Sequence, residues 1–168
     1  MEEVPVRKNL RLKDYDYSGA GYYFLTICVK DRHEMLGTID VDVGAISNRP
    51  LTLMKLSNYG RIVQSVIQEI PVHYAGVTVD KYVIMPNHVH MILIKKHGRL
   101  LIAPTGPPAT VSRVMKQLKR QVSKKIGFSL WQRSYHDHII RDEAEYQRIW
   151  HYIDENPEKW ETDCYFKK

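Results

Sequence analysis

The sequence predicts an α+β fold, with an antiparallel sheet and helices packed on it. Three observations point to it: strand-like apolar segments alternate with amphipathic helical ones, the segments follow the order strand, helix, strand, strand, helix, strand, helix, and the turn-forming residues stand between them. This order is that of a ferredoxin-like β-α-β-β-α-β core followed by a terminal helix. The helices of the core are expected on one face of the sheet.

Each element of this core has its own signal. Aromatic and β-branched residues predict a first strand at 21–29, and residues 36–43 continue as a strand or hairpin before turn residues at 44–50. Ser57 is a helix N-cap, and the helix runs to Ile70, where Pro71 stops it. The remaining elements are strands at about 77–85 and 88–95 joined by a turn, a loop at 98–110, a helix from Thr110 or Ser112 to Ile126 ended by Gly127, a strand at 134–141, and a helix from Asp142 to Asn156 stopped by Pro157.

Composition limits the possible functions. The 168 residues suit one domain, no apolar run approaches the roughly 20 residues that span a bilayer, and the first residues lack an apolar signal core. We therefore expect a cytoplasmic protein with no membrane partner. Cys28 and Cys164 form no metal or redox spacing, and the net charge of +6 favours a polyanionic partner.

Two histidines interrupt an apolar strand. Successive side chains of a strand point to opposite faces, so His88 and His90 share a face while Val89 points the other way. Two adjacent imidazoles on one face suit a divalent metal, although a solvated strand face accounts for the pair equally well. A histidine-triad nucleotide hydrolase would need a third histidine where Ile92 stands, and a cupin would need an all-β chain.

The last helix presents a tyrosine and an amide one turn apart. Tyr146, Ile149, Trp150 and Ile153 cluster on the side that would pack on the sheet, whereas Tyr152 lies off this stripe beside Asn156 at i+4. The pair could be a nucleophile and a ligand. It could equally be a surface tyrosine and a residue that caps the helix before Pro157.

Several motifs occur together in one order. They are Pro86-Asn87-His88-Val89-His90, then Trp131-Gln132-Arg133-Ser134-Tyr135-His136-Asp137-His138, and finally Tyr152-Ile153-Asp154-Glu155-Asn156-Pro157. From about Arg11 to Trp160 the chain resembles the HUH single-tyrosine transposases of the insertion-sequence-200-like group, and most of all the REP-associated tyrosine transposases.

The resemblance implies a metal-dependent DNA strand transferase. Tyr152 would be the nucleophile that forms a 5′-phosphotyrosine link, and His88, His90 and Asn156 would bind a divalent metal, for which Mg²⁺ or Mn²⁺ fits phosphate chemistry. The partner would be single-stranded or hairpin DNA, bound by a monomer or a homodimer. A non-catalytic nucleic-acid-binding protein or repressor derived from the same fold remains the alternative.

Further residues are candidates for contacts to DNA. The basic face of the second core helix carries Arg113, Lys116, Arg120 and Lys124, which would bind phosphates if it borders the site and otherwise would be a solvated face. Arg11 in the first segment could reach a DNA hairpin. His138 matches a histidine typical of the family and is a possible accessory residue, with a structural role at least as reasonable.

Overall fold

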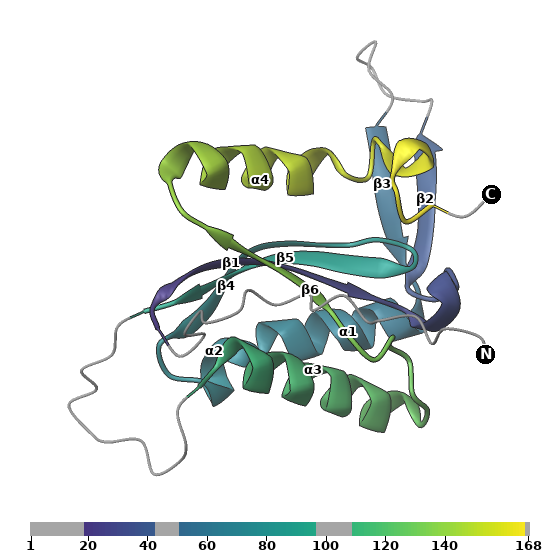
Figure 1. Ribbon diagram of the computed structural model, residues 1–168. Helices are drawn as coiled ribbons and strands as arrows, with labels where there is room; N and C mark the ends of the chain where they lie inside the picture. Colours follow the sequence, from purple (N-terminus) through teal and green to yellow (C-terminus); the bar gives the residue numbers. More distant parts are fainter. Residues whose placement is uncertain (1–18, 43–50, 97–108, 167–168) are drawn as a thin grey trace, which may run out of the picture.

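A four-stranded antiparallel sheet lies between two helical layers (Figure 1). The computed structural model describes residues 19–42, 51–96 and 109–166. The strands of the sheet are β1 (Gly21–Cys28), β4 (Val77–Ile84), β5 (His88–Lys95) and β6 (His136–Ile140), in the spatial order β4-β5-β1-β6. With α1 (Asn58–Gln68) between β1 and β4, and α3 (Val111–Ile126) between β5 and β6, this is the expected ferredoxin-like topology.

The central strand β1 sets the register of the sheet. It pairs antiparallel with β5, so that Thr26 lies opposite His90 and Cys28 opposite His88, and on its other edge it pairs antiparallel with β6. The hairpin of β4 and β5 turns at Pro86 and Asn87, as the sequence predicts. The two histidines therefore enter the sheet directly after this turn.

The two core helices cover one face of the sheet (Figure 1). The Ser57 side chain caps α1, and the Thr110 side chain caps α3, which ends at Gly127 in the left-handed conformation (φ 87°) that glycine adopts without strain. The buried side chains of α3 are those of its predicted apolar stripe, Val111, Val114, Met115, Leu118 and Val122. They pack with alternate residues of β1 and β5 in one large hydrophobic core.

The predicted stop at Pro71 is wrong. The chain leaves α1 at Glu69 but continues helically through α2 (Ile70–His73), which contains the proline in its first turn. A proline is tolerated there because the first amide groups of a helix have no intrahelical acceptor. The actual break falls after His73, where Tyr74 is extended.

A second small sheet lies beside the first helix. It consists of β2 (Gly37–Asp42) and β3 (Leu51–Leu56). The expected strand at 36–43 is confirmed as β2, but its partner strand β3 was not predicted, and the proposed turn at 44–50 lies outside the described residues. A β-carbon on Gly60 would stand 2.1 Å from the Leu36 carbonyl oxygen, so glycine permits α1 to approach the start of this hairpin.

The terminal helix α4 (Glu143–Glu155) packs alone on the opposite face of the sheet (Figure 1). The Asp142 side chain accepts a hydrogen bond from the Glu145 amide at its start, as the capping-box pattern predicts. Ile153 is fully buried and forms a separate hydrophobic cluster with Ile92 and Ile140. This cluster, with further contacts to β4, holds the helix against the sheet.

Two short 3-10 helices complete the described elements. The first, η1 (Lys30–Arg32), follows β1, and the second, η2 (Trp160–Thr162), follows α4. The loop predicted at 98–110 falls largely outside the described residues. None of the described helices is long and apolar enough to cross a membrane.

Candidate active site

The two histidines of β5 are buried on the face covered by α4. His88 is 0% exposed and His90 is 1% exposed, and the intervening Val89 points into the core on the other face. A solvated strand face is thereby excluded. Burial is the main cause that lowers the pKa of His88 to about 2 and that of His90 to about 3, so both rings are neutral at physiological pH.

Hydrogen bonds orient the two rings. The Asn87 amide nitrogen donates to the Arg32 and Tyr165 carbonyls, which leaves its oxygen 2.8 Å from Nδ1 of His88. Since that oxygen can only accept, Nδ1 of His88 carries the proton. Nδ1 of His90 lies 2.8 Å from the Thr26 hydroxyl. The Asn87 partner assigns Nε2 of His88 as an acceptor, whereas the Thr26 hydroxyl can donate to Nδ1 of His90 or accept from it.

The two Nε2 atoms face each other at 3.0 Å. Two lone pairs this close repel each other unless a cation or a proton lies between them. About 3.0 Å is also the separation of two imidazole nitrogens that each bind one ion at roughly 2.1 Å and near a right angle. The donor pair therefore fits a shared divalent metal.

Asn156, one helical turn after Tyr152, carries a buried amide. Its side chain is 2% exposed, and its Oδ1 atom has no hydrogen-bond partner among the described residues. A buried acceptor without a donor costs about 1–3 kcal/mol, which a cation would offset. The amide predicted as the third ligand is thus buried with an unsatisfied oxygen, and its side chain hydrogen-bonds Tyr152, whose hydroxyl lies 3.2 Å from His90.

Asp163 is a further possible ligand that the sequence did not reveal. Ligand atoms of His88, His90 and Asp163 lie within 4.8 Å of one another. The residue follows η2, where no periodic pattern marks an element, so nothing in the sequence linked it to a histidine pair 75 positions earlier. Carboxylate, amide and imidazole donors together suit a hard to intermediate divalent ion such as Mn²⁺ or Mg²⁺.

Tyr152 extends from α4 over this pair. Its hydroxyl lies 3.2 Å from Nε2 of His90, and its ring stands edge-on to His90 and Phe24. The side chain is 40% exposed, so an incoming group can approach it. Burial raises the pKa of Tyr152, and a hydrogen bond with the Asn156 side chain partly opposes the rise.

Residues near the C-terminus close the other side of the site. The Tyr165 ring lies 4.5 Å from that of His88, between centroids, and Trp160 lies 6.0 Å from His88. The Tyr165 hydroxyl also hydrogen-bonds Thr26, and burial raises the pKa of Tyr165 to about 12. Sequence reasoning missed both aromatic residues, although a cluster of aromatic residues after the last helix was visible.

The remaining predicted residues lie elsewhere. The basic helix α3 occupies the face of the sheet opposite α4, so its cations do not border the histidine pair (Figure 1). His138 sits on the α4 side, but it is tied 2.7 Å from Glu145 at the start of that helix, which indicates a structural role. Arg11 lies outside the described residues.

The chain is similar in sequence to two known proteins. No protein-family model matches the chain. An uncharacterized protein of Haemophilus influenzae is 34% identical over 94% of this chain and 91% of its own length. A putative REP-associated tyrosine transposase of the same organism is 24% identical over 86% of this chain and 74% of its own length.

The fold has a solved counterpart. The structure of a REP-associated tyrosine transposase bound to a REP hairpin superposes with a TM-score of 0.59 at 20% sequence identity, over 83% of this chain and 68% of that one. The predicted resemblance and fold class are therefore confirmed. The chain belongs to one family with the uncharacterized Haemophilus influenzae protein, and it resembles the REP-associated tyrosine transposases in sequence and in fold.

Proposed function

We propose that this protein cleaves and rejoins single-stranded DNA with Tyr152 as the nucleophile and a divalent metal held by His88, His90 and Asn156. The observation that carries the proposal is the 3.2 Å separation of the Tyr152 hydroxyl and Nε2 of His90. It joins a partly exposed phenol to two buried, neutral imidazoles and an unsatisfied amide oxygen. Asp163 is proposed as an additional ligand.

The proposed reaction is the transfer of a DNA phosphate to Tyr152. The Tyr152 oxygen attacks phosphorus, the bond to the 3′-oxygen breaks, and the strand is left with a free 3′-hydroxyl and a 5′-phosphotyrosine. The phenol gives up a proton and the 3′-oxygen takes one up. The free 3′-hydroxyl can then attack the phosphotyrosine bond in reverse, so strands are cut and rejoined without an external energy source. A phenol with a raised pKa is a weak nucleophile, and a bound metal would supply charge neutralisation at the phosphate oxygens.

The DNA partner is proposed to be a single strand that carries a hairpin. The REP-associated transposase of similar fold was solved with a REP hairpin. The net charge of +6 suits a polyanion. We further propose that the protein acts in cis, because α4 places Tyr152 against the histidines of its own chain.

A covalent-capture assay tests the proposal. The protein is incubated with a pool of labelled DNA hairpins that have randomised loops and flanks, with Mn²⁺ or Mg²⁺, and analysed on a denaturing gel. A labelled protein band is expected, and chelation by EDTA should remove it. The Tyr152→Phe variant should form no adduct.

Tyr146 provides the matched control on the same helix. Its hydroxyl hydrogen-bonds Asp80 instead of facing the histidines, so Tyr146→Phe should keep forming the adduct. DNA binding without adduct formation by the wild type would favour the non-catalytic DNA-binding alternative. An adduct that persists in Tyr152→Phe would assign the chemistry to another residue.

A further inference from the structure

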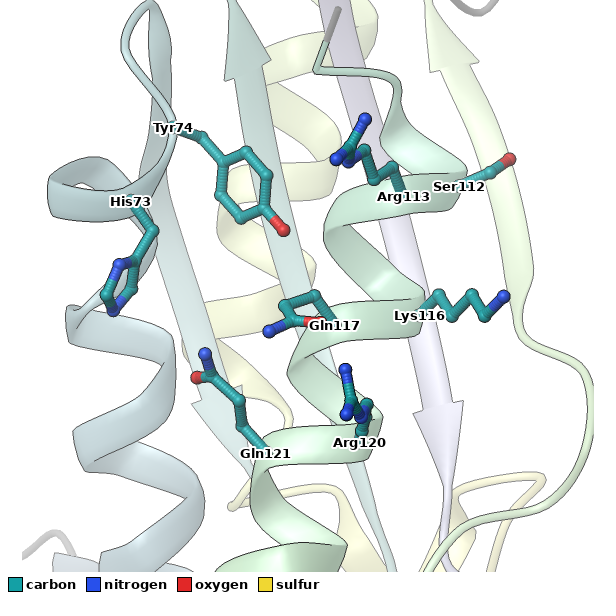
Figure 2. Close-up of a pocket in the computed structure, with 8 residues that line it drawn as sticks. All are labelled: His73, Tyr74, Ser112, Arg113, Lys116, Gln117, Arg120 and Gln121. Carbon is teal, nitrogen blue, oxygen red and sulfur yellow. The ribbon is translucent and has the colours of Figure 1, made fainter. Parts of the chain in front are cut away.

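A polar cavity lies on the side of the sheet opposite Tyr152. It has a volume of about 750 Å³ and opens between α2 and α3 (Figure 2). His73 and Tyr74 line it from the α2 side, and Arg113, Lys116, Gln117 and Arg120 line it from α3. We call this cavity the α2–α3 groove. Three of the four α3 cations predicted to contact DNA line it, and Lys124 does not.

The side chains that line the α2–α3 groove are either basic or neutral. None of its lining residues is acidic, and α3 carries six lysines and arginines with no aspartate or glutamate in 16 residues. The acid close to the α2 side is Glu69, whose carboxylate bonds Lys125 at 3.0 Å and Ser65 at 3.0 Å. Its other oxygen lies 3.9 Å from Nε2 of His73, which lines the groove, so this carboxylate stands at the α2 edge and is shared with Lys125.

Two of the groove cations, Lys116 and Arg120, form no ion pair with the described residues. Both side chains are exposed. Lys119 of the same helix shows the contrast, since its ammonium donates to the Gln132 and Ser134 carbonyls. The apolar stripe of α3 fastens the helix to the sheet, which leaves the groove side available to a ligand.

The spacing of the cations suits a chain of phosphates. Arg113 and Arg120 are seven residues apart, which is about 10 Å along a helix axis, with Lys116 between them. One strand of duplex DNA carries a charge about every 3.4 Å of its axis, so this stretch matches about three phosphates. Gln117, Gln121 and the Tyr74 hydroxyl add neutral donors beside the cations (Figure 2).

We propose that the α2–α3 groove binds the sugar–phosphate backbone of DNA as a contact separate from the Tyr152 site. Since the sheet lies between the two, a DNA that engages both must pass around an edge of the sheet. The groove then holds the DNA at a distance from the scissile bond and adds affinity without reading sequence. The link to cleavage rests on the proposed function, but binding in the groove does not.

The test measures binding without cleavage. Hairpin DNA is titrated by fluorescence anisotropy at several salt concentrations with EDTA present, and the protein carries Tyr152→Phe. The groove pair Arg113→Gln/Arg120→Gln is compared with the control pair Lys55→Gln/Arg133→Gln, which removes the same charge from exposed positions outside the groove. Thermal melts confirm that both variants are folded.

The groove pair should bind about tenfold more weakly or worse, and the slope of log affinity against log salt should fall by about two. The control pair should stay within about threefold of the parent. Equal weakening of the two pairs, or unchanged binding by the groove pair, would overturn the proposal. Groove-dependent binding together with failure of the wild type to form a covalent adduct in the capture assay would instead refute only the proposed function.

Discussion

The hydroxyl of Tyr152 lies 3.2 Å from Nε2 of His90, although 62 residues separate them in the chain. The contact exists because Ile153, the next residue of α4, is buried against Ile92 and Ile140 on the α4 face of the sheet. Packing of one apolar side chain thus sets the position of its polar neighbour.

Activity should not be restored by mixing inactive variants. If each chain uses its own Tyr152 and His88, an equimolar mixture of Tyr152→Phe and His88→Ala forms no covalent DNA adduct. Exchange of α4 between two copies would unite an intact Tyr152 with an intact histidine pair. Adduct formation by the mixture, at a sizeable fraction of the wild-type amount, would therefore contradict action in cis.

Metal affinity should distinguish the ligands. Titration of Mn²⁺ into the Tyr152→Phe protein, followed by calorimetry, should show one tight site that His90→Ala abolishes. Asn156→Ala and Asp163→Ala should each weaken binding, because each removes an oxygen donor from the set. Unchanged affinity in one of the two would remove that residue from the ligand set, and unchanged affinity in His90→Ala would refute the metal site.

Thr26 should affect the metal affinity of the site without binding the metal itself. Its hydroxyl partners Nδ1 of His90 at 2.8 Å, and Thr26→Val keeps the shape of the side chain while removing that partner. Loss of such an orienting contact typically weakens metal binding by about 10–100-fold. Tyr165→Phe is the control for the rest of this hydrogen-bond chain, and it should have the smaller effect. Equal Mn²⁺ affinity in Thr26→Val and wild type would contradict the assigned ring orientation.

Ile153 should couple stability to catalysis. The Ile153→Ala variant loses a fully buried side chain, which should lower the free energy of unfolding by about 2–5 kcal/mol in urea titrations. Because α4 also carries Tyr152, the adduct rate should fall in conditions where the variant is still folded. Ile149→Ala on the same helix is the comparison, since that residue is only partly buried. An unaltered rate in the folded Ile153→Ala protein would show that α4 is held by other contacts.

Acid should remove the stabilising effect of Glu69. Hydrogen bonds from Lys125 and Ser65 hold the pKa of this carboxyl below its ordinary value of 4.5. Its stabilisation is therefore present above pH 4.5 and is lost as the pH falls through the lower folded-state pKa. The Glu69→Gln variant should melt below wild type at neutral pH, and the two melting curves should converge in acid. A difference that grows on acidification would have the wrong sign.

The sequence predicted the parts of this molecule that depend on local patterns. The apolar stripe and caps of α3, the hairpin before His88 and the start of α4 at Asp142 all follow from spacing and capping residues. The return strand β3 was missed because its register depends on a separate two-stranded sheet. Asp163 and Tyr165 were missed because only the folding of the chain after Pro157 brings them to His88.

The position of the basic helix also required the structure. Periodicity showed that the cations and the apolar residues of α3 lie on different sides of the helix, but not which face of the sheet the helix covers. That choice follows from the connections of the β-α-β units. It separates the α2–α3 groove from the site that the motifs indicate.

Mapping the covalent link to DNA identifies the nucleophilic residue directly. The trapped protein–DNA adduct is digested with nuclease and protease, and peptides that carry a nucleotide phosphate are identified by mass spectrometry. The modification is expected on Tyr152 and on no other tyrosine. A link to Tyr146 or Tyr165, with Tyr152 unmodified, would contradict it.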